Sequence, residues 1–340
     1  MFENGYHCIL VVSRTPVRIS FFGGGTDYPE YYLRKRGAVL GTSINKYTHI
    51  SLSNKDPFFD HKYRIAYSRT ELVSHIDEIQ HPSVRECLRK REIEDYLDIH
   101  IFSDLPAKTG LGSSSSFTVG FLNLLSAFEG RYIRPNDLAQ EACLVEQNLI
   151  NENVGSQDQF HATIGGLNIY EFSEKGITHR PLYISSVSRK LLESSLMLFY
   201  TGITRFASQV VAEQVDRTKK LTNDEYLETM HKMVFDFEHI VSEQSDDVLL
   251  RSFGSMLDES WKMKKQLSSS VSNQEIDTSY EKAIAAGAYG GKLCGAGGGG
   301  FLLLVVPQEK QKAVKGAIGL MQVQFSFEDE GSKIIYMKEG

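Results

Sequence analysis

A glycine- and serine-rich segment that opens an apolar helix constrains the fold of this chain more than any other feature. Residues 105–116 are Leu-Pro-Ala-Lys-Thr-Gly-Leu-Gly-Ser-Ser-Ser-Ser, and residues 99–103 before them have the partial alternation of a β-strand. Over residues 114–129 apolar side chains recur at helical spacing, which predicts a helix with one buried face. The expected order of strand, tight loop and helix places the unpaired N–H groups of the helix start beside the loop.

This loop has the chemistry of a phosphate-binding site. Glycines let the backbone approach a ligand closely, the first N–H groups of a helix attract anions, and serine hydroxyls can add hydrogen bonds or bind Mg²⁺. No Gly-Lys-Ser/Thr closes the segment, so it is not a Walker A motif. A Gly/Ser linker is the alternative, but flexible linkers do not run directly into an amphipathic helix. The residues predicted to bind a nucleotide's phosphates are Pro106, Lys108, Gly110, Leu111, Gly112, Ser113, Ser114, Ser115 and Ser116.

A second glycine-rich run lies far away in the sequence. Residues 290–300 are dominated by glycine and lead straight into residues 301–306, which are predicted to form a strand. Taken alone, the run suits either a backbone packed against a ligand or a tight crossing of two chains. Its value comes from pairing with the serine-rich loop, because two glycine loops on two domains can close over one nucleotide.

The length of the chain favours two domains with a cleft between them. The 340 residues exceed the usual size of about 100–200 residues for one domain. Strands followed by helices in each half favour an α+β class, with expected domains at residues 1–185 and 186–340. The other expected strands span residues 8–12, 18–22, 41–53 and 63–67, and the other expected helices span residues 83–97, 135–150, 280–286 and much of 222–267.

Charge, cysteine content and hydropathy restrict the partners and the compartment. With a net charge of −6, no general attraction to nucleic acid or to anionic lipid is expected, and an anionic ligand must be held locally. Cys8, Cys87, Cys143 and Cys294 show no zinc-ligand spacing and are expected to be buried, reduced thiols. The N-terminus does not resemble a signal peptide and no segment reaches about 18 apolar residues, so we expect a cytoplasmic protein without a membrane partner. Nothing in the sequence indicates an oligomeric state.

Two acids and an arginine are the remaining candidates for chemistry. Asp158 lies in Gly-Ser-Gln-Asp-Gln, residues 155–159, and Arg18 lies on a predicted strand that leads into another glycine loop. A carboxylate can orient a hydroxyl and accept its proton, and a nearby guanidinium stabilises the charge that develops. From the residues alone, a lone acid such as Asp158 is more often a solvated turn residue, and Glu146 is interpreted as a surface acid on a predicted helix.

Taken in order, these segments resemble the GHMP kinases, the superfamily of galactokinase, homoserine kinase, mevalonate kinase and phosphomevalonate kinase. Residues 106–116 are similar to its Pro-x3-Gly-Leu-Gly-Ser-Ser phosphate loop, and residues 292–300 are similar to its glycine-rich third motif. The resemblance spans nearly the whole chain. It implies a two-domain α+β fold with an N-terminal domain like ribosomal protein S5 domain 2, a ferredoxin-like C-terminal domain, and ATP and a sugar between them.

The resemblance also implies a role for each candidate. Arg18 and Asp27 keep the spacing of the galactokinase arginine and its sugar-binding aspartate, and Asp158 matches the catalytic aspartate, with Arg18 as its electrostatic partner. Glu146 and Ser114 are implied to bind Mg²⁺, with Ser113 and Ser115 as alternatives to Ser114. The residues expected to bind the sugar substrate are Gly24, Gly25, Thr26, Asp27, Arg205, Gly297 and Gly298.

Differences from galactokinases bear on the substrate. Their hexose-gripping Glu-His is replaced by Gly24-Gly25, which leaves room for a longer sugar. The string Gly-Gly-Gly-Thr-Asp-Tyr-Pro and residues 200–205 resemble the branch that phosphorylates the anomeric hydroxyl of D-glycero-D-manno-heptose 7-phosphate. Such a substrate ends in a dianion, so Arg205 is expected to hold its phosphate, with Lys108 as the second candidate. Two alternatives stay open: an L-fucose kinase-like enzyme for a neutral sugar, and a sensor that binds ligand without turnover.

Overall fold

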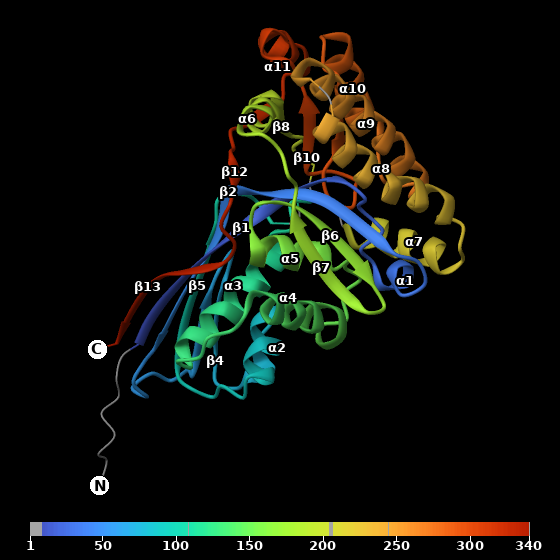
Figure 1. Cartoon of the computed structure of the whole chain (residues 1–340). Helices are drawn as coiled ribbons and strands as arrows, with labels where there is room; N and C mark the ends of the chain where they lie inside the picture. The colour runs from blue at the N-terminus through green and yellow to red at the C-terminus, as the bar shows by residue number, and fades with distance from the viewer. Residues whose placement is uncertain (1–8, 108, 204–206, 244, 340) are drawn as a thin grey trace.

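The computed structural model describes residues 9–107, 109–203, 207–243 and 245–339, which fold around two β-sheets (Figure 1). Within these residues, nine strands form the first sheet, in the order β13-β1-β2-β5-β3-β4, with β6 and β12 also paired to β2 and β7 paired to β6. The strands of the first sheet are β1 (Ile9–Phe22), β2 (Gly37–Asn54), β3 (Tyr63–Ala66), β4 (Thr70–Val73), β5 (Leu97–Ser103), β6 (Leu167–Ser173), β7 (Gly176–Pro181), β12 (Phe327–Glu328) and β13 (Lys333–Glu339).

The long strands β1 and β2 form the centre of the first sheet. They pair antiparallel along almost their whole length, from Leu10 opposite Ser53 to Phe22 opposite Leu40. The prediction of separate strands at residues 8–12 and 18–22 is wrong, because β1 continues through Pro16 with a register shift after it. Pro16 is tolerated because β13 pairs with β1 only as far as Arg14, so beyond that point one edge of β1 needs no backbone donor for β13.

Helices cover one region of this sheet and carry the loops of the later site. Helices α3 (Ser113–Phe128) and α5 (Gln157–Ile164) pack on β1 and β2, and α2 (Pro82–Lys90) and α4 (Pro135–Leu144) contact α3. The helix expected over residues 114–129 is confirmed as α3. The helix expected over residues 83–97 ends early, because Glu92 adopts a left-handed φ of 55° before the chain enters β5. The helix expected over residues 135–150 passes at its end into a π-helical turn, Val145–Leu149.

The second sheet has the order β11-β8-β10-β9 and lies beside a layer of long helices (Figure 1). Helices α8 and α9 confirm the helical pattern expected within residues 222–267, β10 confirms the strand expected at residues 301–306, and α10 is longer than the helix expected at residues 280–286. The elements of this half are α6 (Ser186–Ser195), β8 (Leu196–Tyr200), α7 (Ala207–Lys219), α8 (Asp224–Glu243), α9 (Asp246–Leu267), α10 (Gln274–Ala285), β9 (Gly290–Leu293), β10 (Phe301–Val305), α11 (Gln311–Ile318) and β11 (Met321–Val323).

The two halves share one hydrophobic core. Phe21 and Phe22, at the end of β1, contact Phe253 of α9 with ring centroids 5.2 and 5.8 Å apart. Leu198 and Leu303 of the second sheet belong to the same cluster of buried side chains. Full burial of an apolar side chain stabilises a fold by about 1.5–3 kcal/mol. The end of β1 is therefore anchored in both halves at once. The first glycine loop, residues 23–25, begins directly after it.

The chain returns to the first sheet at its end. β12 pairs with β2, and β13 runs antiparallel beside β1, as Figure 1 shows. The sequence did not predict these two strands. The expected domain boundary between residues 185 and 186 falls between β7 and α6, and it stays a proposal.

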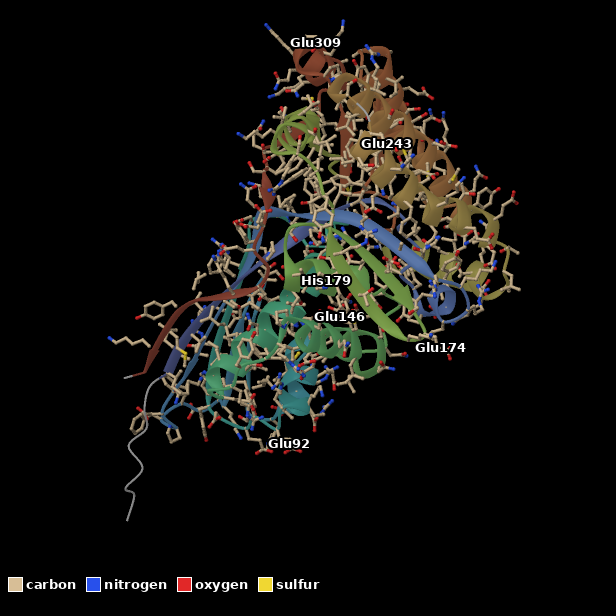
Figure 2. The ribbon with its side chains drawn as sticks, viewed as in Figure 1. Glu92, Glu146, Glu174, His179, Glu243 and Glu309 are labelled. Atoms are coloured by element: carbon tan, nitrogen blue, oxygen red, sulfur yellow. The ribbon has the colours of Figure 1, made fainter. Side chains whose placement is uncertain are left out.

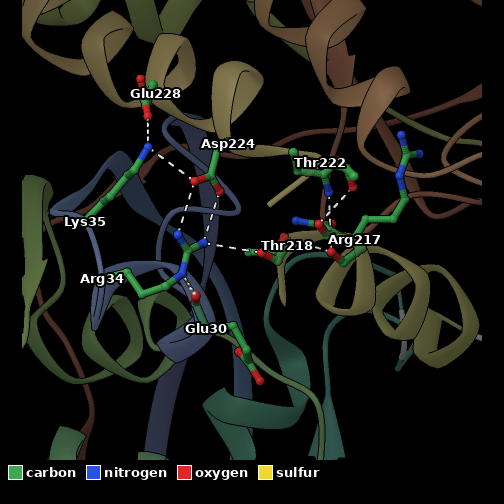
Figure 3. A network of polar contacts seen from close by, with 10 residues as sticks. Glu30, Arg34, Lys35, Arg217, Thr218, Thr222, Asp224 and Glu228 are labelled. Atoms are coloured by element: carbon green, nitrogen blue, oxygen red, sulfur yellow. Dashed lines mark hydrogen bonds and ion pairs between the residues drawn. The ribbon is translucent and has the colours of Figure 1, made fainter. Parts of the chain in front are cut away.

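A network of charges also joins the first domain to α7 and α8 (Figure 3). Asp224, at the start of α8, accepts hydrogen bonds from Nη1 and Nη2 of Arg34 at 3.1 and 3.0 Å. Lys35 Nζ lies 3.2 Å from the same carboxylate and also pairs with Glu228. Because Arg34 and Lys35 follow α1 (Pro29–Tyr32), the network fixes the start of α8 against the first domain.

Three of the four cysteines lie in the described part of the chain. Cys87, Cys143 and Cys294 are buried free thiols, as expected, and Cys8 lies outside it. Among the helices that the structure describes, none combines the length and the apolar character needed to cross a bilayer.

Candidate active site

A cavity of about 460 Å³ lies between the loops of the first domain and the helices of the second. The first-domain wall comes from the loops that follow β1, precede α3 and precede α5. The opposite wall comes from α7, α8, α9 and the glycine-rich run at residues 290–300. The lining includes Ser20, Gly24, Asp27, Tyr28, Gly110, Ser113, Ser114, Ser115, Gln157 and Asp158 on one side and Val211, Gln214, Met230, Lys264, Leu267, Lys292, Gly295 and Ala296 on the other.

The start of α3 faces this cavity. Gly112 precedes the helix with a left-handed φ of 76°, a conformation that glycine adopts without strain. Ser116 N donates the first helical hydrogen bond, to Gly112 O, so the N–H groups of residues 113–115 precede that bond and occupy the anion-binding positions of a helix. Of the residues predicted to bind phosphate, Gly110, Gly112, Ser113, Ser114 and Ser115 line the cavity, Pro106, Leu111 and Ser116 do not, and Lys108 lies outside the described residues.

The two glycine-rich segments touch each other at this point. A Cβ atom on Gly110 would lie 2.5 Å from Cys294 O, and one on Gly295 would lie 2.2 Å from Gly110 Cα. Only glycine permits such an approach of two backbones. The glycine-rich run at residues 290–300 therefore makes a tight crossing with another segment of the chain, which was one of the two interpretations of its sequence. The same crossing brings Gly295 and Ala296 to the cavity wall.

Arg18 and Asp158 form a bidentate ion pair at the cavity. Nε and Nη2 of Arg18 donate to Oδ1 and Oδ2 of Asp158, both at 2.8 Å. Nη1 of the same guanidinium donates to Gly110 O at 2.7 Å, so Arg18 also holds the phosphate loop. The side chain of Arg18 is 6% exposed and that of Asp158 is 23% exposed, which leaves the carboxylate accessible from the cavity. The fold thus brings together Arg18 of β1 and Asp158 of α5, two residues that the sequence alone does not place together.

Asp27 connects the glycine loop that follows β1 to the start of α5, which carries Asp158. Its carboxylate accepts hydrogen bonds from Gly25 N at 3.0 Å and from Gln157 N at 3.3 Å. Gly155 permits this contact, since a Cβ atom there would lie 1.9 Å from Asp27 Oδ2. Burial, and after it the charge of Asp158, raise the pKa of Asp27, while the backbone donors lower it.

The other predicted sugar-binding residues differ in their exposure to the cavity. Gly24 and Gly25 line it. Thr26 is fully buried and its hydroxyl donates to Gly23 O at 2.7 Å, so it shapes the loop without reaching the cavity wall.

Gly297 and Gly298 lie behind the wall. Gly298 N donates to Val271 O at 2.8 Å, and a Cβ atom on Gly297 would lie 2.8 Å from the backbone of Val271. Neither glycine is among the residues that line the cavity, and their expected contact with the sugar stays a prediction. Arg205 lies outside the described residues.

Glu146 lies in the π-helical turn after α4, among the helices of the first domain (Figure 2). Its Oε2 accepts hydrogen bonds from Ser115 Oγ at 2.8 Å and from Gln159 Nε2, whereas no partner for Oε1 exists among the described residues. Burial raises the pKa of Glu146 to about 7, and neighbouring hydroxyl and amide donors offset part of the rise. The serine that contacts Glu146 is Ser115, while Ser114 is exposed.

This arrangement fits a cation that is shared with a ligand. The carboxylate of Glu146 is buried, and among the described residues one of its oxygens has no partner while the other accepts from Ser115 Oγ. Ser114 and Ser115 both line the cavity. In the described part of the chain, no group of three or more His, Cys, Asp or Glu side chains is arranged to hold a metal ion by itself. Mg²⁺ is commonly bound by one or two carboxylates together with substrate phosphates and water. Here Glu146 would supply the carboxylate, and the ligand and water would supply the remaining oxygens.

Two buried lysines at the cavity were not predicted as site residues. Lys264 of α9 donates to Gly295 O, and Lys292 of β9 donates to Phe21 O at 2.8 Å. Both line the cavity. The helical periodicity of α9 could have predicted that Lys264 is buried, because Lys264 lies seven residues after the buried Leu257 and therefore on the same face of the helix.

Comparison with known proteins identifies relatives along the whole chain. The family model described as "GHMP kinases N terminal domain" matches residues 81–166, and the model described as "GHMP kinases C terminal" matches residues 248–320. A D-glycero-alpha-D-manno-heptose 7-phosphate kinase of Campylobacter jejuni is 31% identical over 338 residues, which cover 94% of this chain and 97% of that protein. An L-fucokinase/L-fucose-1-P guanylyltransferase of Bacteroides fragilis is 25% identical over 90% of this chain, but over only 35% of that longer protein.

Solved structures show the same fold. The crystal structure of a D-glycero-D-manno-heptose 1-phosphate kinase from Bacteroides thetaiotaomicron has a TM-score of 0.77 and covers 96% of this chain and 99% of its own, at 23% identity. A likeness at that identity concerns the fold alone. It confirms the expected two-domain α+β architecture.

Proposed function

The chain belongs to the GHMP kinases, and from this premise we propose that it is an ATP-dependent sugar kinase whose acceptor is D-glycero-D-manno-heptose 7-phosphate. In this reaction the γ-phosphoryl group of ATP passes to the anomeric hydroxyl and gives the 1,7-bisphosphate, for nucleotide-activated heptose and surface glycans. The observation that carries the choice of acceptor is the 31% identity, over nearly the full length of both chains, to a heptose 7-phosphate kinase. The enzyme is proposed to act in the cytoplasm on free small molecules.

Asp158 is proposed as the general base. Its carboxylate is partly exposed at the cavity, where it can accept the proton of an acceptor hydroxyl. Arg18 fixes the orientation of both carboxylate oxygens by its two parallel hydrogen bonds and stabilises the alkoxide that develops. Because Arg18 also bonds to Gly110, the base and the phosphate loop are held in one geometry.

The start of α3 is proposed to bind the phosphates of ATP. Its N–H groups at residues 113–115 and the bare backbone of Gly110 and Gly295 let the phosphates approach closely. In phosphoryl transfer most of the acceleration comes from positioning and charge neutralisation, so this backbone contributes to the rate as much as the base.

Glu146 is proposed to hold Mg²⁺ together with Ser114 or Ser115. Among the described residues one oxygen of the carboxylate has no partner, Ser115 Oγ donates to the other oxygen, and Ser114 and Ser115 both line the cavity. A bound Mg²⁺ supplies positive charge to the phosphates of ATP and to the charge that develops during transfer.

The acceptor is proposed to lie over the first glycine loop. Gly24 and Gly25 offer no side chain to the cavity, which supports space for a seven-carbon sugar. Asp27, which also lines the cavity, is proposed to accept a hydrogen bond from a sugar hydroxyl. We retain Arg205 as the candidate for the terminal phosphate of the sugar. Thr26, Gly297 and Gly298 are proposed to act through the shape of their loops.

Coupled measurement of ADP release with heptose 7-phosphate, L-fucose and galactose tests this function. The proposal expects the highest kcat/KM with heptose 7-phosphate. Preference for L-fucose would instead favour the second candidate, a fucose kinase, for which the likeness to the Bacteroides fragilis fucokinase is the supporting observation. Binding of sugar without ADP release would indicate a sensor and would overturn the kinase assignment.

A further inference from the structure

Three basic side chains line the cavity, Arg18 on the first-domain side and Lys264 and Lys292 on the opposite side. Arg18 comes from β1, Lys264 from α9 and Lys292 from β9, so the group unites both halves of the molecule. The exposed fractions of these residues are 5%, 7% and 3%. A buried cluster of positive charge is unexpected in a chain whose net charge is −6.

The two lysines lack carboxylate partners. Across the described residues, no ion pair involves Lys264 or Lys292, and the guanidinium of Arg18 is paired with Asp158 alone. Lys292 Nζ donates one hydrogen bond, to Phe21 O, and Lys264 Nζ donates two, to Leu293 O and Gly295 O. An ammonium group has three donors, so donors remain on both lysines beside the cavity.

Burial of unpaired cations is costly. It lowers the pKa of Lys292 to about 8, with Arg18 adding repulsion, and it lowers the pKa of Lys264 well below its ordinary value, with repulsion from Lys292 as the next cause. An anion between the ammonium groups would reverse both effects, because it offsets the repulsion and accepts the remaining hydrogen bonds.

We propose that Lys264 and Lys292, together with Arg18, form the binding site for the phosphoryl group in transit, which is the terminal phosphate of the nucleotide. This inference rests on the proposed function and adds two residues to its site. In the transfer, a bond forms between the anomeric oxygen and the γ-phosphorus, the bond from that phosphorus to the β-bridging oxygen breaks, the hydroxyl proton goes to Asp158, and ADP leaves. The lysines neutralise the oxygens of the group that moves.

The position of the lysines selects this phosphate over that of the sugar. Lys264 binds the carbonyl of Gly295, whose backbone contacts Gly110 of the phosphate loop, and Arg18 binds Gly110 and Asp158 together. The anomeric oxygen must lie at Asp158 to lose its proton. The phosphorus that it attacks is then its immediate neighbour, whereas the 7-phosphate lies at the far end of the carbon chain.

Nucleotide pairs that differ only in the terminal phosphate test this site. The variants Lys264→Met and Lys292→Met remove the charge and keep the length of the side chain. The matched control is Lys262→Met, which removes an exposed lysine from the same helix, α9. Titration calorimetry compares the affinities for ADP and for the non-hydrolysable analogue AMP-PNP, with thermal unfolding to confirm that each variant is folded.

The expected result is a loss of about tenfold or more in affinity for AMP-PNP in either lysine variant, with ADP affinity within about twofold of the wild type, since hydrogen bonds to charged groups are among the strong ones. The control should match the wild type with both nucleotides. Equal losses of affinity for ADP and for AMP-PNP would overturn the proposal and would indicate that the lysines act only by hydrogen bonding to backbone carbonyl groups. Unchanged nucleotide affinities with a raised KM for heptose 7-phosphate alone would overturn it in favour of the sugar phosphate.

A second measurement uses the wild type and does not depend on the folding of a variant. At pH 9 the phosphates of both nucleotides are ionised and Lys292 is mostly neutral, so binding of AMP-PNP should take up protons that binding of ADP does not. Calorimetry in two buffers of different ionisation enthalpy measures this uptake. Equal proton uptake with the two nucleotides would refute the site, and failure of either nucleotide to bind would refute the proposed kinase function instead.

Discussion

A matched pair of glycine substitutions separates strain of the backbone from damage to the site. Gly112 and Gly130 flank the same helix, α3, and both have left-handed φ values, 76° and 66°. A Cβ atom on Gly112 would lie 3.1 Å from Asp158 Oδ2, whereas one on Gly130 would have no atom within 4 Å. Gly112→Ala and Gly130→Ala therefore share the conformational cost but differ in contact with the base.

The shared cost sets the expected loss of stability. An L-residue in the left-handed region costs about 1–2 kcal/mol, so both variants should lose about that much free energy of unfolding in denaturant titrations. In Gly112→Ala the carboxylate of Asp158 must also shift by a few tenths of an ångström. Since a misplacement of about 1 Å can cost about 10²-fold, a shift of a few tenths of an ångström should lower kcat/KM by about 4-fold to 10-fold.

The assay is steady-state ADP release with heptose 7-phosphate, alongside the denaturant titrations. Gly130→Ala should keep kcat/KM within about twofold of the wild type, because its Cβ atom meets nothing and the site is unchanged. If Gly112→Ala and Gly130→Ala had the same activity, the reasoning that places Asp158 against the phosphate loop would be refuted.

Three further perturbations address the base, the buried acid and the charge network. Asp158→Asn should lower kcat by roughly 10²–10⁴-fold with little change in ATP affinity, and near-normal turnover in stopped assays would remove Asp158 from the mechanism. Burial raises the pKa of Glu146 from 4.5 to about 7, so the folded protein disfavours the ionised carboxylate. In ligand-free protein this should lower the free energy of unfolding progressively between pH 5 and pH 8, by about 3 kcal/mol in total, and Glu146→Gln should abolish this pH dependence. A stability difference between that variant and the wild type that is flat over this range would contradict the assignment. Asp224→Asn should cost about 1 kcal/mol of unfolding free energy at low salt and less at high salt, because its partners Arg34 and Lys35 are partly exposed; a loss independent of salt would contradict the electrostatic origin.

The phosphate loop and its helix could be predicted because local rules decide them. The apolar spacing of residues 114–129 fixes the buried face of α3, and the glycines before it allow the tight entry that the structure shows. The same local rules failed at Glu92, where one left-handed residue ended α2, and at residues 145–149, where a π-helical turn replaced an α-helix. Glu146 lies in that turn and is buried, whereas the sequence alone suggested an acid on the solvated surface of a helix.

The remaining parts of the site depend on contacts across long separations. The pairing of Arg18 with Asp158 joins residues 140 positions apart, and no local pattern encodes it. Strand β12 has two residues, too few for a sequence pattern, and both β12 and β13 pair with strands from the opposite end of the chain, β2 and β1. Lys264 was hidden for a different reason: a run of lysines suggests a solvated face, although its helical phase places it on the buried side of α9.

The most direct test of the central claim is the position of the phosphate in the product. Wild-type protein is incubated with ATP, Mg²⁺ and D-glycero-D-manno-heptose 7-phosphate, and the product is examined by phosphorus–proton correlation NMR. We predict a second phosphorus resonance coupled to the anomeric proton, with the 7-phosphate resonance retained and one equivalent of ADP released. A new phosphate on any other carbon, or no product from this sugar while L-fucose is phosphorylated, would contradict it.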